Sequence, residues 1–243
     1  MEELSHFGPR IIMSFAGGKV VITETIFTSL ILCVLIVAVT SWMAAGLRKQ
    51  PTKRQVIAEF IVEMIYKLVN STMGARNMKF APYIGTIIIY ILLGNMLGLF
   101  GFRPITADVN TTFALSTITF FLIEYNSFRS MGLKGKLKHM CDPYPFMFPL
   151  KIIESLSRPI SLGFRLFGNI LGGVVVMELV MIGLAGIGHK LSISIPIFQI
   201  AIPLPANFFF DMFEPVVQAF IFTMLTMVFI TIEMASHGDE EHH

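Results

Sequence analysis

Long uncharged stretches alternate with short charged loops along this chain. Two of these stretches, residues 25–47 and 80–102, are each 23 residues long and have a charged residue on either side. A helix needs about 20 mostly apolar residues to cross the hydrocarbon core of a bilayer. A third apolar stretch, residues 111–128, contains a single charged residue, Glu124. The pattern predicts three membrane spans in the first half of the chain.

The segment 52–72 has a different pattern. Its apolar residues recur at helical spacing, and Lys, Gln and Glu residues occupy the positions between them. An apolar stripe opposite a charged face is typical of a helix at an interface, and so many charges disfavour a spanning helix. We expect a surface helix on the cytoplasmic side of the membrane. The same pattern also fits a helix that packs on a soluble partner.

The C-terminal part of the chain predicts a long hairpin of two helices. Residues 149–188 and 196–236 are mostly apolar. An arm of about 40 residues is about 60 Å long, about twice the thickness of the hydrocarbon core, so both helices must be strongly tilted or extend beyond the bilayer. Pro203, Pro205 and Pro215 favour a kink in the second arm. The predicted fold is a single all-α polytopic membrane domain with five transmembrane helices and one amphipathic interfacial helix.

The composition supports this class of protein. Of the 243 residues, 54% are hydrophobic and 14% are charged, and the mean hydropathy is +0.73. Soluble domains carry about 25% charged residues, so this chain has too few charges to cover a water-soluble domain of its size. The net charge of +2 gives no reason to expect a nucleic-acid partner. Lipid is therefore the expected surrounding of most of the chain.

Basic residues determine the expected orientation. One cluster of Lys and Arg follows the first span at residues 48–54, and another follows the third span at residues 129–139. Cytoplasmic loops of membrane proteins are enriched in Lys and Arg, and the two clusters fall on one side if the spans alternate. The N-terminal segment 1–24 is therefore expected outside the cell membrane, and the tail 237–243 in the cytoplasm.

One face of the first arm carries a positive charge at mid-membrane depth. At about 100° per residue, six residues fall within about 80° of one another: Glu154, Ser157, Ser161, Arg165, Gly168 and Gly172. A charge inside a span costs about 2.5–3.5 kcal/mol on insertion scales and indicates a functional site, and small residues let another backbone approach closely. We expect a contact surface centred on Arg165. The alternative is a scaffold in which Arg165 pairs with an internal acid.

The second arm carries a column of polar residues. On an ideal helix, four of them fall within about 60° of one another: Asn207, Asp211, Glu214 and Gln218. Such a column inside a bilayer lines a water-filled path or packs on polar groups of a neighbouring helix. We expect a water-filled path.

Depth along the hairpin orders the charges. With the turn centred near Ser192, Arg165 lies within about one residue of the depth of Gln218. The acids on the outer side of Arg165 are then Glu178, Asp211 and Glu214, and those on the inner side are Glu154 and Glu233. We expect one aqueous path from outside to the arginine and a second from there to the cytoplasm, with the arginine blocking direct passage of cations.

Other kinds of chemistry are not indicated. The six histidines all lie in the predicted loops and tails, so we expect no catalytic Ser–His dyad and no metal cluster inside the membrane. The chain contains no glycine motif for binding phosphates or dinucleotides. We expect neither a metal nor a cofactor.

Two stretches resemble a known family. The sequence SRPISLGFRLFGN at 157–169 and the sequence QAFIF at 218–222 are similar to subunit a of F-type ATP synthases, and the order of spans resembles the bacterial form. The resemblance implies a stator subunit, not an enzyme on its own, that provides two offset half-channels beside a rotating ring of c subunits. It implies the b subunits of the peripheral stalk as further partners, and the inner (plasma) membrane as the location. It places the essential arginine at Arg165 and nearby family positions at Asn169 and Gln218, and the transported cation is expected to be a proton.

The chain departs from that family at two positions. Val174 stands where many relatives carry Glu or His, and Asp211 stands where many bacterial relatives carry His. We therefore expect relocated acids in the outer half-channel. Two alternatives are a self-contained ion channel or secondary transporter, for which we find no internal symmetry, and a membrane scaffold with purely structural charges.

Overall fold

The computed structural model describes residues 11–15, 20–46, 51–141, 144–190 and 203–235. Their elements are β1 (Ile11–Phe15), β2 (Val20–Thr23), α1 (Glu24–Ala44), α2 (Lys53–Met73), η2 (Ala75–Phe80), α3 (Ala81–Met96), η3 (Leu97–Phe100), η4 (Ile105–Ala107), α4 (Val109–Cys141), α5 (Met147–Lys190), α7 (Pro203–Phe208), η5 (Phe209–Phe213) and α8 (Glu214–Ala235). The η elements are 3-10 helices except η5, which is a π-helical turn. The predicted centre of the hairpin turn and the predicted tail 237–243 lie outside the described residues.

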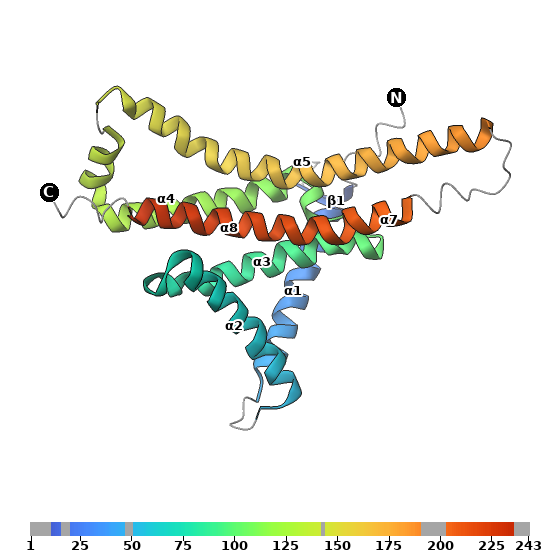
Figure 1. Cartoon of the computed structure of the whole chain (residues 1–243), viewed down its shortest axis with the longest axis horizontal. Helices are drawn as coiled ribbons and strands as arrows, with labels where there is room; N and C mark the ends of the chain where they lie inside the picture. Colours follow the sequence, from blue (N-terminus) through green and yellow to red (C-terminus); the bar gives the residue numbers. More distant parts are fainter. Residues whose placement is uncertain (1–10, 16–19, 47–50, 142–143, 191–202, 236–243) are drawn as a thin grey trace.

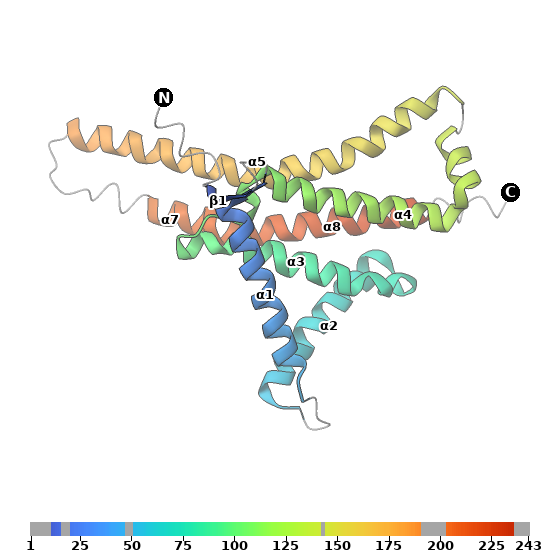
Figure 2. The same ribbon diagram turned by 180° about the vertical axis from the view of Figure 1, so that it is seen from behind.

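Four helices lie along the long axis of the molecule, and two others run crosswise to them. α3, α4, α5 and α8 form the long group. α1 extends away from its middle, and α2 returns obliquely toward the start of α3 (Figures 1 and 2). α1 has 21 residues and is about 32 Å long, enough to cross the hydrocarbon core when upright. When α1 stands upright, the long helices are therefore strongly tilted.

The two arms of the hairpin are connected and antiparallel, but they are not each other's main neighbours. α5 has 44 residues and extends for about 66 Å. It packs most extensively along α4, and α8 packs mainly on α3 and α4 (Figure 1). The described part of the second arm begins at Pro203, and the predicted start at residue 196 lies outside the described residues.

The predicted class, an all-α polytopic membrane protein, is confirmed. Four helices of the described part are long and apolar enough to cross a membrane: Glu24–Ala44, Ala75–Phe100, Met147–Gly186 and Pro203–Met234. α4, which contains the predicted third span 111–128, is not among them, because its mean hydropathy is lowered by Glu124, by Asn126 and by several hydroxyl-bearing residues. Four of these are fully buried, at helical spacing: Thr112, Ser116, Thr119 and Ser127. The polar side of α4 thus faces other helices, and a fifth span stays a prediction.

A short antiparallel strand pair precedes the first helix. The hydrophobic pattern did not predict these strands. β1 pairs with β2, and α1 follows β2 directly. The Thr23 hydroxyl caps α1 by accepting a hydrogen bond from the Ile26 backbone N–H over 3.3 Å, and Glu24 in the first turn complements the helix dipole.

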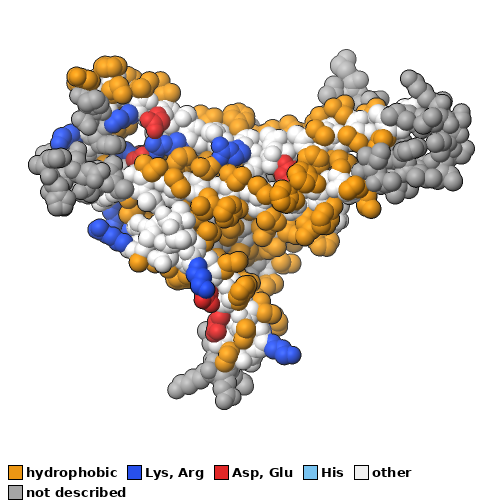
Figure 3. Space-filling model, in the orientation of Figure 1, with side chains coloured by type: hydrophobic (Ala, Val, Ile, Leu, Met, Phe, Trp, Pro, Cys, Tyr) orange, Lys and Arg blue, Asp and Glu red, His pale blue; other side chains and the backbone are white. Residues whose placement is uncertain are grey.

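Apolar side chains cover much of the outer surface. On α1, Leu30, Val34 and Val37 are all more than 60% exposed, and hydrophobic atoms spread along the long helices in Figure 3. Soluble monomers rarely expose apolar surface on this scale. This surface fits contact with lipid or with other membrane subunits.

α2 divides into two parts. Near its C-terminal end, Ile65, Val69 and Met73 are buried in a cluster that includes residues of α3 and α8. Nearer its start, Ile57 and Phe60 are 57% and 65% exposed. One part of the amphipathic helix therefore packs on the bundle, and its placement at the membrane surface stays a prediction.

Candidate functional site

The face of α5 that carries Arg165 is open along its length. All six residues of the predicted row are exposed: Glu154, Ser157, Ser161, Arg165, Gly168 and Gly172. On the other side of the helix, Leu162 and Leu166 are at most 2% exposed and pack in a cluster with residues of α3 and α8. A Cβ added at Gly168 or Gly172 would meet nothing within 4 Å. We call these six exposed residues the Arg165 strip.

Arg165 has no internal counter-ion within the described part of the chain. No described residue forms an ion pair or a hydrogen bond with its guanidinium. Instead, the side-chain Nε2 of Gln218 donates to the backbone carbonyl oxygen of Arg165 over 3.0 Å. This bond confirms that the two residues lie at the same depth, and it joins α8 to α5 without using the positive charge. The scaffold alternative, with Arg165 paired to an acid of the same chain, finds no support among these residues.

The second arm is irregular around Asp211, in line with the interruption expected from its prolines. Residues Phe209–Phe213 form a π turn, in which the N–H of Glu214 bonds the carbonyl of Phe209 five residues earlier. Pro215 provides the physical reason, because proline has no N–H and its ring clashes with the carbonyl four residues before it, that of Asp211. The wider turn rotates Asn207 and Asp211 relative to the residues of α8. Single π turns inside α-helices often occur at functional sites.

The four residues of the polar column consequently have different surroundings. Gln218 and Glu214 are 3% and 9% exposed, Asp211 is partly buried, and Asn207 is exposed. Glu214 lies against α5, where its Oε2 is 3.3 Å from the position of a Cβ added at Gly173. Asp211 lies against η3 instead, because its Oδ1 is 3.2 Å from a Cβ added at Gly98.

The remaining two predicted residues lie on α5. Asn169, one turn after Arg165, is partly buried, and Glu178 is exposed. The structure therefore does not bring Glu178 into the buried contact that holds Glu214.

A buried polar group at the end of α3 was missed by the sequence analysis. Asn95 is 1% exposed and its Oδ1 accepts a hydrogen bond of 2.6 Å from Thr106, while its Nδ2 has no partner among the described residues. It lies about one helical turn before Gly98, the neighbour of Asp211. The available signal was an isolated asparagine inside the apolar stretch 80–102.

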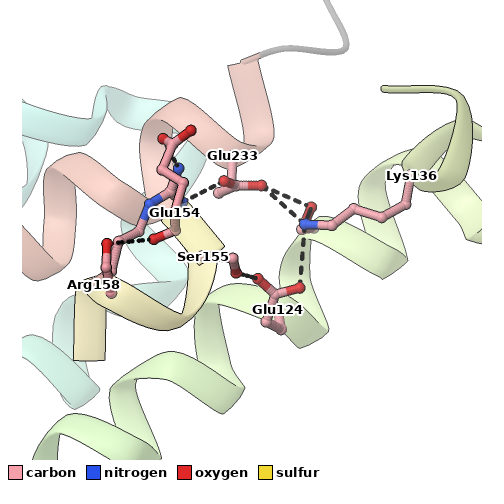
Figure 4. A network of polar contacts seen from close by, with 8 residues as sticks. Glu124, Lys136, Glu154, Ser155, Arg158 and Glu233 are labelled. Atoms are coloured by element: carbon pink, nitrogen blue, oxygen red, sulfur yellow. Dashed lines mark hydrogen bonds and ion pairs between the residues drawn. The ribbon is translucent and has the colours of Figure 1, made fainter. Parts of the chain in front are cut away.

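At the end of the bundle that was predicted to face the cytoplasm, charged residues of α4, α5 and α8 form one network (Figure 4). Glu233 is at its centre. Its Oε1 accepts a hydrogen bond from Arg158, and its Oε2 lies 3.0 Å from the Lys136 ammonium and 3.1 Å from the Ser127 hydroxyl. Both carboxylate oxygens of Glu233 are therefore engaged.

The network continues to two further acids. Lys136 lies 3.2 Å from Glu124, whose other oxygen accepts a hydrogen bond of 2.7 Å from Ser155. Arg158 lies 3.0 Å from Glu154. The Glu154 side chain is 63% exposed and belongs to the Arg165 strip, whereas the Glu233 side chain is only 10% exposed. Of the two predicted inner acids, only Glu154 thus shares a surface with Arg165.

The charged side chains around α5 fall into separate groups. Among the described residues, no three His, Cys, Asp or Glu side chains come together to hold a metal. The structure offers Arg165 on an open strip without a counter-ion among the described residues, acids toward the C-terminal end of α5, and an ionic network of three acids and two cations toward its N-terminal end.

The family model and the relatives that match this chain all indicate the same family. A family model described as ATP synthase A chain matches residues 26–231. The subunit a of Moorella thermoacetica is 30% identical over 235 residues, which cover 96% of this chain and all of that protein. The subunit a of Bacillus subtilis is 33% identical over 211 residues, covering 82% of this chain and 85% of that protein.

A further relative is described as ATP synthase subunit a, sodium ion specific. It comes from Propionigenium modestum and is 30% identical over 237 residues, covering 91% of this chain and 76% of that protein. With its four apolar helices and these bacterial relatives, the chain is a multi-pass membrane protein. The chain belongs to the ATP synthase subunit a family and is a membrane-sector subunit of ATP synthase.

Proposed function

We propose that this subunit is the stator that carries cations to and from a rotating ring of c subunits, with Arg165 facing the ring. The observation that carries the proposal is the exposed Arg165 guanidinium, which has no counter-ion among the described residues of its own chain. A charge within a span is costly unless it meets a partner or water. A carboxylate on a neighbouring ring is the partner that satisfies this requirement.

The shape of the strip supports the same partner. Gly168 and Gly172 leave the backbone of α5 open, and Ser157 and Ser161 add only short side chains. Small residues let helices approach closely in a membrane. A ring can therefore slide along this surface while Arg165 attracts each ionised carboxylate in turn, which favours release of the bound cation.

We propose that the two half-channels meet the strip from opposite sides. Asp211 and Glu214, with Asn207 and Glu178, serve the outer half-channel, and the π turn at Phe209–Phe213 sets the direction of Asp211. Glu154 serves the inner half-channel together with Glu233, and the exposure of Glu154 favours it as the group that exchanges cations. The positive charge of Arg165 between them prevents a direct leak.

The driving force follows from the separation of the two half-channels. Each cation that crosses a potential of 100 mV releases about 2.3 kcal/mol. Because Arg165 blocks the short route, this energy is available only through rotation of the ring, which drives ATP synthesis. The b subunits of the peripheral stalk hold the stator against this rotation. We propose the orientation that the basic loops predict, with the N-terminus outside the plasma membrane and the C-terminus in the cytoplasm.

Replacement of the arginine tests the proposal. In inverted vesicles that contain the complete complex, Arg165→Ala is expected to reduce ATP-driven cation pumping to background while the subunit remains at its normal amount. Arg76→Ala is the matched control, because Arg76 is an exposed arginine of η2, away from the strip. Normal pumping by Arg165→Ala would contradict the proposal.

Two related measurements address the alternatives. The purified subunit alone, reconstituted into vesicles, is expected to transport no cations, and transport by it alone would favour a self-contained channel. The ion is tested by pumping with and without Na⁺, because one relative is described as sodium ion specific. We propose a proton, so pumping is expected to continue without Na⁺.

A further inference from the structure

The position of Lys136 results from a reversal of the chain. α4 is interrupted at Gly132, whose φ of +70° is a conformation that favours glycine. The residues after it fold back, so that the Lys136 ammonium lies 2.7 Å from the hydroxyl of Ser127, nine residues earlier. In a straight helix those two residues would be about 13 Å apart along the axis. The reversal thus places an amine inside the bundle, where Lys136 is only 5% exposed.

The surroundings of this ammonium are those of a bound cation. Three oxygens surround it: Glu233 Oε2 at 3.0 Å, Glu124 Oε2 at 3.2 Å and Ser127 Oγ at 2.7 Å. The ring of Phe128 lies 5.6 Å away, within the range of a cation–π interaction. Figure 4 shows Lys136 reaching from α4 to both carboxylates.

We infer that Lys136 is a tethered cation that fills a cation site at the inner end of the bundle and keeps mobile cations out of it. Its ammonium contacts one oxygen each of Glu124 and Glu233. This contact holds the Glu233 carboxylate in place, with its other oxygen directed at Arg158. Arg158 in turn holds Glu154 at the edge of the Arg165 strip. Lys136 is thus a positioning residue for the inner half-channel, and this last step rests on the proposed function.

The site would be accessible if the ammonium were removed. A groove of about 480 Å³ between α4 and α5 reaches Glu124 and Ser155. Its other lining residues include the aromatic side chains Phe120, Phe121, Tyr125 and Phe128. The groove therefore gives a small cation a route to Glu124. Without Lys136, Glu124 would lose its ion-pair partner and Glu233 would keep only Arg158, so this pair of carboxylates would attract such an ion.

The test measures cation-dependent stability of the complete complex, which does not require pumping. We compare wild type, Lys136→Ala and Lys136→Arg by the temperature at which the complex dissociates, in NaCl and in N-methylglucamine chloride of equal ionic strength. Lys136→Ala is expected to dissociate at a lower temperature in N-methylglucamine and to recover most of the loss in Na⁺, because a ligand stabilises the state that binds it. Wild type and Lys136→Arg are expected to show only the Na⁺ effect that their common ring produces.

Two further variants separate charge from packing. Lys67→Ala is the matched control, since Lys67 also pairs with a glutamate, at 2.8 Å, but on the exposed face of α2, where it lowers the pKa of Glu63. It is expected to match wild type. Glu124→Gln combined with Lys136→Ala removes one charge of each sign and is expected to weaken the Na⁺ dependence seen in Lys136→Ala.

The inference is overturned if Lys136→Ala shows no Na⁺ dependence beyond wild type, or if the double variant keeps all of it. It is also overturned if Lys136→Ala and the double variant both fail to assemble in Na⁺ while Lys136→Arg assembles, because the long side chain would then be needed for folding. These results are independent of the proposed function. Normal pumping by Arg165→Ala would remove that function and leave the cation site of Lys136 untouched.

Discussion

Gly172 and Gly173 of α5 are adjacent but have different surroundings: Gly173 packs against the chain itself, and Gly172 faces open space where a partner subunit can lie. A Cβ at Gly173 would lie 2.9 Å from Cδ1 of Phe210 and 3.3 Å from Oε2 of Glu214, so alanine there forces the Phe210 ring to move. A Cβ at Gly172 would meet nothing within 4 Å. Gly172→Ala should therefore leave the fold of the chain intact and favour the helix by about 0.5–1 kcal/mol.

The same methyl group becomes unfavourable once a ring lies against the strip. Extra carbon in a close contact costs about 1–3 kcal/mol, which lowers the population of that contact by roughly 5- to 150-fold. We expect Gly172→Ala to reduce ATP-driven pumping within this range, while the amount of subunit in the membrane stays at or above that of wild type. Gly172→Leu is expected to abolish pumping without loss of the subunit.

Inverted vesicles that contain the complete complex provide both measurements. Quantitative immunoblotting gives the amount of subunit, and quenching of a cation-gradient indicator after ATP addition gives pumping. Gly173→Ala is the matched control and is expected to lower the amount of subunit itself. Full pumping by Gly172→Leu would refute the reasoning, because no partner could then lie close to the strip.

Two further changes test other parts of the site in the same vesicles. Gln218→Leu removes the hydrogen bond to the Arg165 carbonyl, and since such bonds between membrane helices contribute about 0.6 kcal/mol and at most about 1.7 kcal/mol, we expect a partial loss of pumping. A loss as complete as that of Arg165→Ala would contradict this estimate. Asp211→Asn is expected to slow ATP synthesis driven by an imposed gradient more than Glu178→Gln does, because Asp211 lies beside the buried polar end of α3, and the reverse order would move the outer path to Glu178.

The main features of the fold could be predicted because the bilayer constrains the sequence so strongly. Long uncharged stretches identified the helices, and the length of the last two required a tilt that agrees with the crosswise packing of α1. α4 was harder to assess, since its polar residues face other helices and lower the hydropathy of its span. The strand pair before α1 depends on pairing between two short segments, and the helical periodicity used to find the spans cannot predict such pairing.

The candidate site was predictable where helices are regular. The exposed row through Ser161, Arg165 and Gly168 and the depth of Gln218 both follow from ideal helical geometry, and the structure has both. Ideal geometry does not describe the surroundings of Asp211, where a π turn precedes Pro215. The prolines indicated an irregular second arm but not the type of turn.

The ionic network was beyond such geometry for a different reason. The sequence showed Lys136 only as part of a basic loop. Its burial depends on one positive φ at Gly132 and on acids contributed by α4 and α8. Contacts of this kind depend on where the chain reverses, and spacing along a single helix does not record that.

Cross-linking along α5 in the complete complex tests the central claim most directly. Single cysteines replace Ser161 or Gly172 on the strip, and Leu162 or Leu166 on the buried side, in a background without the two native cysteines. Each cysteine carries a short photoreactive cross-linker, and products are identified by mass spectrometry. We predict products with the c subunit from both strip positions and none from the buried positions. Absence of these products from the strip, or equal yields from both sides of the helix, would contradict the placement of Arg165 against the ring.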